Sequence, residues 1–110
     1  MIRHIFLAAV KNGVSEEIVQ GIVKNLQALT AKYPTVRAGK NLGWFSDKTQ
    51  IALTADFEDK DSWDAFINSP EHTEIVKHSM KYYDPNMLFA ISSRPTATSS
   101  VLMRSLSSSE

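Results

Sequence analysis

The chain has 110 residues, of which 43% are hydrophobic and 22% are charged, and its twelve basic residues balance its twelve acidic ones. These values are typical of one globular domain, and the zero net charge removes the electrostatic basis for binding nucleic acid or an anionic membrane. The absence of cysteine excludes disulfides, zinc–thiolate sites, iron–sulfur clusters and thiol nucleophiles.

An apolar run near the start, residues 5–10, is too short to span a bilayer or to form the core of a signal peptide. Charged Arg3 and Lys11 flank it closely. We therefore expect no membrane partner and a cytoplasmic location.

Residues 1–10 predict a first strand, because they are mostly apolar with β-branched and aromatic side chains and are followed by Asn12-Gly13. The next segment has apolar residues at helical spacing: Ile18, Val19, Ile22, Val23, Leu26 and Leu29. Ser15 is the expected N-cap of this helix, and Pro34 marks its far limit.

Residues 36–45 and 48–58 favour extended structure and predict a hairpin, with Ser46-Asp47 as a tight turn. In the second run every other residue is apolar, from Ile51 to Phe57. This alternation is typical of a strand with one buried face.

A second helical region begins near Asp59 and is interrupted at Ser69-Pro70, where Ser69 is the expected N-cap of a new segment that extends to about Tyr83. Residues 84–86, Asp-Pro-Asn, are typical of a turn, and residues 87–91 predict the last strand.

The predicted order β-α-β-β-α-β indicates an α+β, ferredoxin-like fold, an antiparallel sheet with helices on one face. The chain is too short to cover the other sheet face, so we expect a homodimer through that face, in which the two sheets form a dimeric α+β barrel. Residues 1–91 are the predicted domain.

Residues 92–110 are rich in Ser and Thr and are expected to form a flexible tail. Four apolar residues in it are candidates for one turn docked on a neighbour: Val101, Leu102, Met103 and Leu106.

His72 is the leading candidate for a functional residue. It shares a helical face with Ile75, Val76, Ser79, Met80 and Tyr83, and this face should point at the sheet. An imidazole aimed into an apolar interior needs a hydrogen-bond partner, a water or a ligand. The alternative is a histidine satisfied locally near the helix start.

His4 lies on the same side of the first strand as Phe6 and Ala8, and on that side it would approach His72. Two histidines across one cavity suit acid–base chemistry near neutral pH. The opposite orientation stays open, because Ile5 and Leu7 are as apolar as Phe6.

Signals for cofactors and metals are weak. His72 and His78 are six residues apart, which misses the three- or four-residue spacing that puts two ligands on one helical face, and no carboxylates converge on them. No nucleotide-binding glycine motif and no serine-nucleophile motif occurs. We therefore expect no metal and no cofactor.

Three stretches together resemble the stress-responsive A/B barrel family: Met1-Ile2-Arg3-His4-Ile5 followed by Val14-Ser15-Glu16-Glu17, then Val36-Arg37-x-Gly39-x-Asn41, then Phe66-x-x-x-Pro70-x-His72. The resemblance covers about residues 1–91. It implies a dimer in which two sheets close into a barrel, in agreement with the uncovered sheet face.

One branch of that family, the plant polyketide cyclases, uses a cavity between sheet and helices for a cofactor-free aldol cyclisation. The resemblance implies His72 as the base and His4 as a cavity residue. The cyclase tyrosine is replaced by Phe66, its orienting carboxylate by Ala90 and a further pocket histidine by Ile51. Polyketide cyclisation is therefore not expected.

These observations predict a dimer that binds or processes a small, largely apolar molecule, with His72 and His4 as catalytic residues. The side chains expected to line the pocket are Phe6, Ile51, Phe66, Val76, Met80 and Tyr83. Two alternatives stay open: a non-catalytic, stress-associated structural dimer, and a cofactor-independent monooxygenase or lyase. An open cavity of roughly a few hundred Å³ would favour the first reading, and a space filled by side chains would favour the structural dimer.

Overall fold

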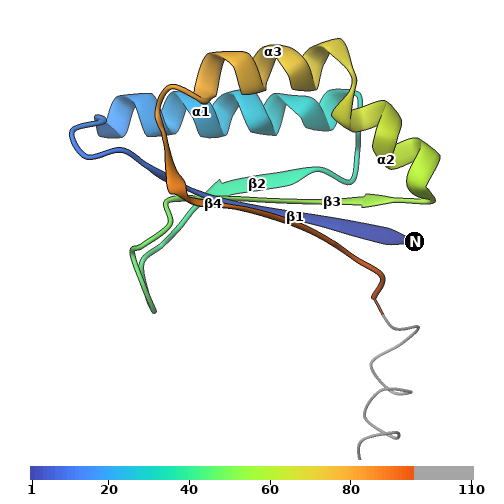
Figure 1. The fold of residues 1–110 in the computed structure, drawn as a ribbon, viewed down its shortest axis with the longest axis horizontal. Coiled ribbons are helices and arrows are strands. Elements are labelled where there is room, and N and C mark those ends of the chain that lie inside the picture. The colour runs from blue at the N-terminus through green and yellow to red at the C-terminus, as the bar shows by residue number, and fades with distance from the viewer. Residues whose placement is uncertain (96–110) are drawn as a thin grey trace, which may run out of the picture.

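The computed structural model describes residues 1–95. Its elements are β1 (Ile2–Val10), α1 (Glu16–Ala28), a short 3-10 helix η1 (Leu29–Ala31), β2 (Arg37–Lys40), β3 (Ile51–Phe57), α2 (Lys60–Ile67), α3 (Pro70–Ser79) and β4 (Tyr83–Ser93). The strands form one antiparallel sheet in the order β2-β3-β1-β4, and the helices lie on one face of it (Figure 1). The α+β, ferredoxin-like architecture and the interrupted second helical region are as predicted.

The core lies between this sheet and the helices. Alternate residues of β3 are buried from Ile51 to Phe57, and α1 contributes the face predicted from its spacing: Val19, Ile22, Val23 and Leu26. In the register of β1 with β3, His4 pairs with Ala55 and Phe6 pairs with Leu53. Since paired residues share a sheet face, His4 and Phe6 also face the helices, and the opposite orientation of β1 is wrong.

Side-chain caps set the starts of the helices. The Ser15 hydroxyl accepts a hydrogen bond from the Ile18 N–H at 3.3 Å, and the Asp59 carboxylate accepts one from the Ser62 N–H at 2.9 Å. The buried Ser69 hydroxyl accepts from the His72 N–H at 3.2 Å and donates to the Phe66 carbonyl at 2.7 Å. Ser69 thus joins the end of α2 to the start of α3 and places His72 in the first turn.

The predicted tight hairpin turn at residues 46–47 is wrong. Strands β2 and β3 are shorter than expected and are joined by a loop of residues 41–50. The Asn41 side-chain amide donates to the carbonyls of Ser46 and Thr49, both at 2.7 Å, and Gly43 has a positive φ of 76°. These local bonds compete with the strand ladder, so pairing ends at Lys40 and Ile51.

The last helix and the last strand also differ from the prediction. Helix α3 ends at Ser79, and Tyr83 is the first residue of β4. The predicted turn at residues 84–86 lies inside β4, where the Asn86 N–H donates to the Asp84 carboxylate at 2.9 Å and the register with β1 shifts. The turn chemistry therefore produces an irregularity in the strand instead of a boundary.

Strand β4 ends at Ser93, so residues 92 and 93, assigned to the tail by their composition, belong to the sheet. Pairing explains the difference, because Ser92 lies opposite His4 and Ser93 lies opposite Arg3. The predicted apolar turn of the tail lies outside the described residues.

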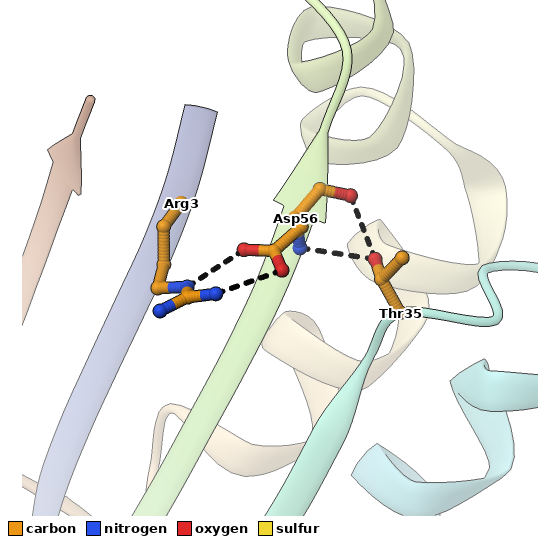
Figure 2. Close-up of polar contacts among 3 residues, drawn as sticks. All are labelled: Arg3, Thr35 and Asp56. Carbon is orange, nitrogen blue, oxygen red and sulfur yellow. Dashed lines mark hydrogen bonds and ion pairs between the residues drawn. The ribbon is translucent and has the colours of Figure 1, made fainter. Parts of the chain in front are cut away.

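A polar cluster joins three segments at one end of the sheet (Figure 2). The Arg3 guanidinium donates two hydrogen bonds to the Asp56 carboxylate, at 2.8 and 3.0 Å. The Thr35 hydroxyl accepts from the Asp56 N–H at 2.9 Å and donates to the Asp56 carbonyl at 2.7 Å. The cluster fixes the segment before β2 against β3 and β1.

The sheet face opposite the helices is uncovered within residues 1–95, and it has an apolar patch beside the Arg3–Asp56 pair. Leu7 lies opposite Phe89 in the register of β1 with β4, and Ile5 lies opposite Ile91. Phe89 is 47% exposed and Ile91 is 58% exposed. The loop of residues 41–50 extends from the sheet on this same side (Figure 1), and it carries the exposed Trp44 and Phe45.

Candidate functional site

A cavity between the sheet and the helices brings both candidate histidines together. It is lined by His4, Phe6, Leu26, Leu53, Phe66, His72, Ile75, Val76, Met80 and Tyr83. His4 and Phe6 come from β1 and Leu53 comes from β3, whereas His72 and Val76 come from α3. Residues far apart in sequence thus form one mostly apolar pocket.

The cavity has a volume of about 70 Å³. A water molecule takes about 30 Å³ in the liquid, and pockets for drug-sized ligands take roughly 300–1,000 Å³. The cavity is therefore smaller than expected, but it is not filled by side chains. Val76 and Met80, which are 37% and 47% exposed, form its outer wall.

His4 is held by a hydrogen bond outside the cavity. Its side chain is almost fully buried, and its Nδ1 accepts from the Trp63 indole N–H on α2 at 3.3 Å. Burial lowers the pKa of His4 below its ordinary value, and the nearby His72 ring lowers it further. His4 is therefore the neutral imidazole near pH 7.

His72 packs against an aromatic ring at the cavity wall. The centroids of the His72 and Phe66 rings are 5.0 Å apart. Burial lowers the pKa of His72, and the backbone carbonyl of Ile67 partly offsets this by favouring the protonated form. A half-buried, neutral imidazole at a cavity is suited to accept a proton.

Phe66 is the hydrophobic centre of this wall. It is 1% exposed, and its ring lies 4.9 Å from that of Tyr33 and 5.1 Å from that of Phe57, measured between centroids. The phenol expected at this position in a cyclase is absent, and the space around the ring is occupied by other aromatic side chains. Phe66 therefore shapes the cavity and offers it no proton.

Two hydroxyl groups lie near the end of α3. Burial raises the pKa of the Tyr83 phenol, and the neighbouring Ser79 hydroxyl offsets this only in part. Ser79 is fully buried, and its hydroxyl makes no hydrogen bond of normal geometry to any residue from 1 to 95. Tyr83 adds a polar group to the cavity wall, whereas Ser79 does not line the cavity.

Most of the residues predicted for the pocket line it, with one exception. Ile51 is buried at the start of β3, opposite Ala8 and two residues before the cavity residue Leu53. Ile51 therefore packs in the core and does not line this cavity. Leu26 and Leu53 carry only the periodicity of core residues, and no local sequence signal links Trp63 to His4.

Elsewhere in residues 1–95, no group of three His, Asp or Glu side chains is placed to hold a metal ion. His78 is exposed on α3. A second hollow beside the polar cluster of Figure 2 is lined by Arg3 and Arg37. Both guanidinium groups already have partners, since Arg3 binds Asp56 and Arg37 donates to the carbonyls of Pro34 and Val36.

In the described part of the chain, no helix has the length and apolar character needed to cross a membrane.

Comparison with known proteins supports the fold and its family. The sequence pattern of the stress responsive A/B barrel domain matches residues 2–90. No curated protein matches the sequence significantly.

Three solved structures illustrate the similarity. The Arabidopsis thaliana protein At3g17210 has 23% identity and a TM-score of 0.71, with 90% of this chain and 99% of that chain covered. A dimeric ferredoxin-like protein of unknown function from Thermobifida fusca has 23% identity and a TM-score of 0.75, with 86% and 90% covered. The hydroxynitrile lyase of Passiflora edulis has 19% identity and a TM-score of 0.72, with 88% and 94% covered.

Proposed function

The chain belongs to the stress responsive A/B barrel domain family, and from this premise we propose that it binds and processes a small, largely apolar molecule in the cavity between the sheet and the helices. The observation that carries the proposal is the convergence of His4 and His72, from β1 and α3, on one apolar cavity. Both imidazoles have a lowered pKa caused mainly by burial, so a proton acceptor is present at neutral pH.

His72 is the proposed acid–base residue. Its ring borders the cavity, its backbone is fixed by the Ser69 cap, and Phe66 packs against one side of it. A base held this way needs little rearrangement to reach a bound molecule. His4 completes the polar part of the wall.

The cavity volume restricts the ligand to a few non-hydrogen atoms unless the outer wall moves. Met80 has an unbranched, rotatable side chain, so its displacement is the simplest way to admit a longer molecule. The Passiflora protein is a lyase on the same fold. A cofactor-independent acid–base reaction such as a lyase cleavage is therefore the reaction class we favour over an oxidation.

Proton transfer to small ketones gives a direct test. The purified protein is incubated with acetone, butanone or cyclopentanone in deuterated buffer, and deuterium in the methyl or methylene groups is followed by NMR. His72 would take the proton from the carbon beside the carbonyl, the C–H electron pair would form the carbon–carbon double bond, and the carbonyl π pair would move to oxygen to give an enolate. Reversal of these shifts with a solvent deuteron would restore the carbonyl and leave deuterium on carbon.

We expect exchange above the buffer rate in the wild type, its loss in His72→Ala, and its retention in the control His78→Ala, whose histidine is exposed. Dimer formation is checked in parallel. Absence of both binding and exchange with every ketone, or equal exchange in His72→Ala, would contradict the proposal.

The second candidate function is a non-catalytic dimer, favoured by the small cavity and by the uncovered sheet face. Leu7, Phe89 and Ile91 give this face the apolar character of an interface, and structural neighbours are described as dimeric. We propose that two copies associate through it in either case. In the non-catalytic version, His72→Ala lowers stability and no ketone binds.

A further inference from the structure

Trp63 makes a polar contact that the proposed function does not use. Its indole N–H donates to His4 Nδ1 at 3.3 Å, and the two rings lie at 56° with centroids 6.2 Å apart. An indole nitrogen can only donate, so His4 Nδ1 must be the acceptor. In a neutral imidazole, the proton then resides on the other nitrogen, Nε2.

The position of the Trp63 contact decides which nitrogen of the His4 ring can interact with a molecule in the cavity. His4 lines the cavity and Trp63 does not. The bond to Trp63 therefore engages His4 Nδ1 with a residue outside the pocket. The other ring nitrogen carries the hydrogen available to the pocket. The remaining side chains of the wall are mostly hydrocarbon, so this N–H is one of few donors there.

We propose that Trp63 is a positioning residue that fixes His4 as the Nε2–H tautomer and thereby makes His4 the hydrogen-bond donor of the cavity. A molecule bound there carries an acceptor, such as a carbonyl oxygen, that faces His4. This ligand class rests on the proposed function, whereas the tautomer is a property of the free protein.

The two histidines then have complementary roles. A neutral His72 ring has one nitrogen that donates a hydrogen bond and one that accepts, so it can supply the acceptor that His4 does not. His4 offers a donor and His72 offers an acceptor to the same space. This arrangement selects a ligand with an acceptor atom next to a transferable proton.

The tautomer can be measured without a ligand. Heteronuclear NMR of protein with isotope-labelled histidine distinguishes protonated from unprotonated ring nitrogens. Trp63→Phe removes the N–H and keeps an aromatic ring, and Trp44→Phe is the matched control because Trp44 is 89% exposed in the loop. Acetone is the probe for the donor role.

We expect unprotonated Nδ1 at His4 in the wild type and in Trp44→Phe, and a mixture of tautomers in Trp63→Phe. Acetone should shift the His4 Nε2 resonance in the wild type, and its affinity should fall in Trp63→Phe. A protonated Nδ1 in neutral wild-type His4, or a tautomer unchanged in Trp63→Phe, would overturn the inference.

The result is separable from the test of the proposed function. Loss of the wild-type tautomer in Trp63→Phe supports the positioning role even if no ketone undergoes exchange. Conversely, exchange that depends on His72 but occurs with the same affinity and the same His4 tautomer in Trp63→Phe supports the function and refutes the role of Trp63.

Discussion

Acidification should destabilise this protein over a pH range that is set by the pKa values of its two cavity histidines, His4 and His72. Burial lowers the pKa of both His4 and His72 in the folded state. The unfolded chain has the ordinary histidine pKa of about 6.5, so near that pH it binds more protons than the folded protein. The stabilisation is fully present above about pH 6.5 and is lost as the pH falls through the folded values.

The size of the effect follows from proton linkage. Each histidine contributes up to about 1.4 kcal/mol per pH unit between its unfolded and folded pKa. Two histidines therefore change the free energy of unfolding by at most about 2.8 kcal/mol for each pH unit in this range. A typical domain is stabilised by only roughly 5–15 kcal/mol, so a change of this size is measurable. Repulsion between the two rings, which contributes to the lowered pKa of His4, delays the second protonation.

The assay is urea unfolding in steps from about pH 7.5 to about pH 5 at one protein concentration, because the proposed dimer would make stability depend on concentration. Asp56 has a pKa lowered by its bond to Arg3, so its contribution is lost only at lower pH, outside this range. His4→Gln and His72→Gln should each flatten the profile, whereas the surface control His78→Gln should keep it. A wild-type profile that is flat over this range would refute the reasoning.

Two further predictions concern stability and assembly. Ser79→Ala should leave the free energy of unfolding unchanged or raise it, because the buried hydroxyl makes no hydrogen bond of normal geometry within residues 1–95. Ser69→Ala should lower it by about 1 kcal/mol through loss of a helix cap, and a loss of similar size in Ser79→Ala during thermal unfolding would mean that Ser79 is bonded to a neighbour. Ile91→Asp should convert the proposed dimer to a monomer in light scattering, whereas Thr73→Asp on α3 should not. A dimer that survives Ile91→Asp would place the interface elsewhere.

The fold was predictable because its main signals are local and periodic. The helical spacing of α1, the alternation of β3 and the Ser69-Pro70 interruption each persist in the structure. The element ends were less predictable, because they depend on particular bonds. The Asn41 amide shortens β2 and β3, and pairing with β1 extends β4 through Asp84-Pro85-Asn86.

The candidate site was predictable in part for the same reason. The helical face of α3 placed His72 toward the sheet, and strand alternation left two orientations for His4, of which the register with β3 selects one. The bond between Trp63 and His4 joins segments far apart in sequence, so no local sequence pattern predicts it. The cavity volume depends on how large side chains such as Phe66 pack, which spacing does not determine.

The central claim is that the cavity beside His72 binds a small molecule and that His72 moves its proton. The most direct measurement is deuterium exchange into acetone, butanone and cyclopentanone by the wild type and by His72→Ala, with His78→Ala as the control. The account predicts exchange above the buffer rate that is lost only in His72→Ala. Exchange at the buffer rate for every ketone, with no binding, or equal exchange in all three proteins would contradict it.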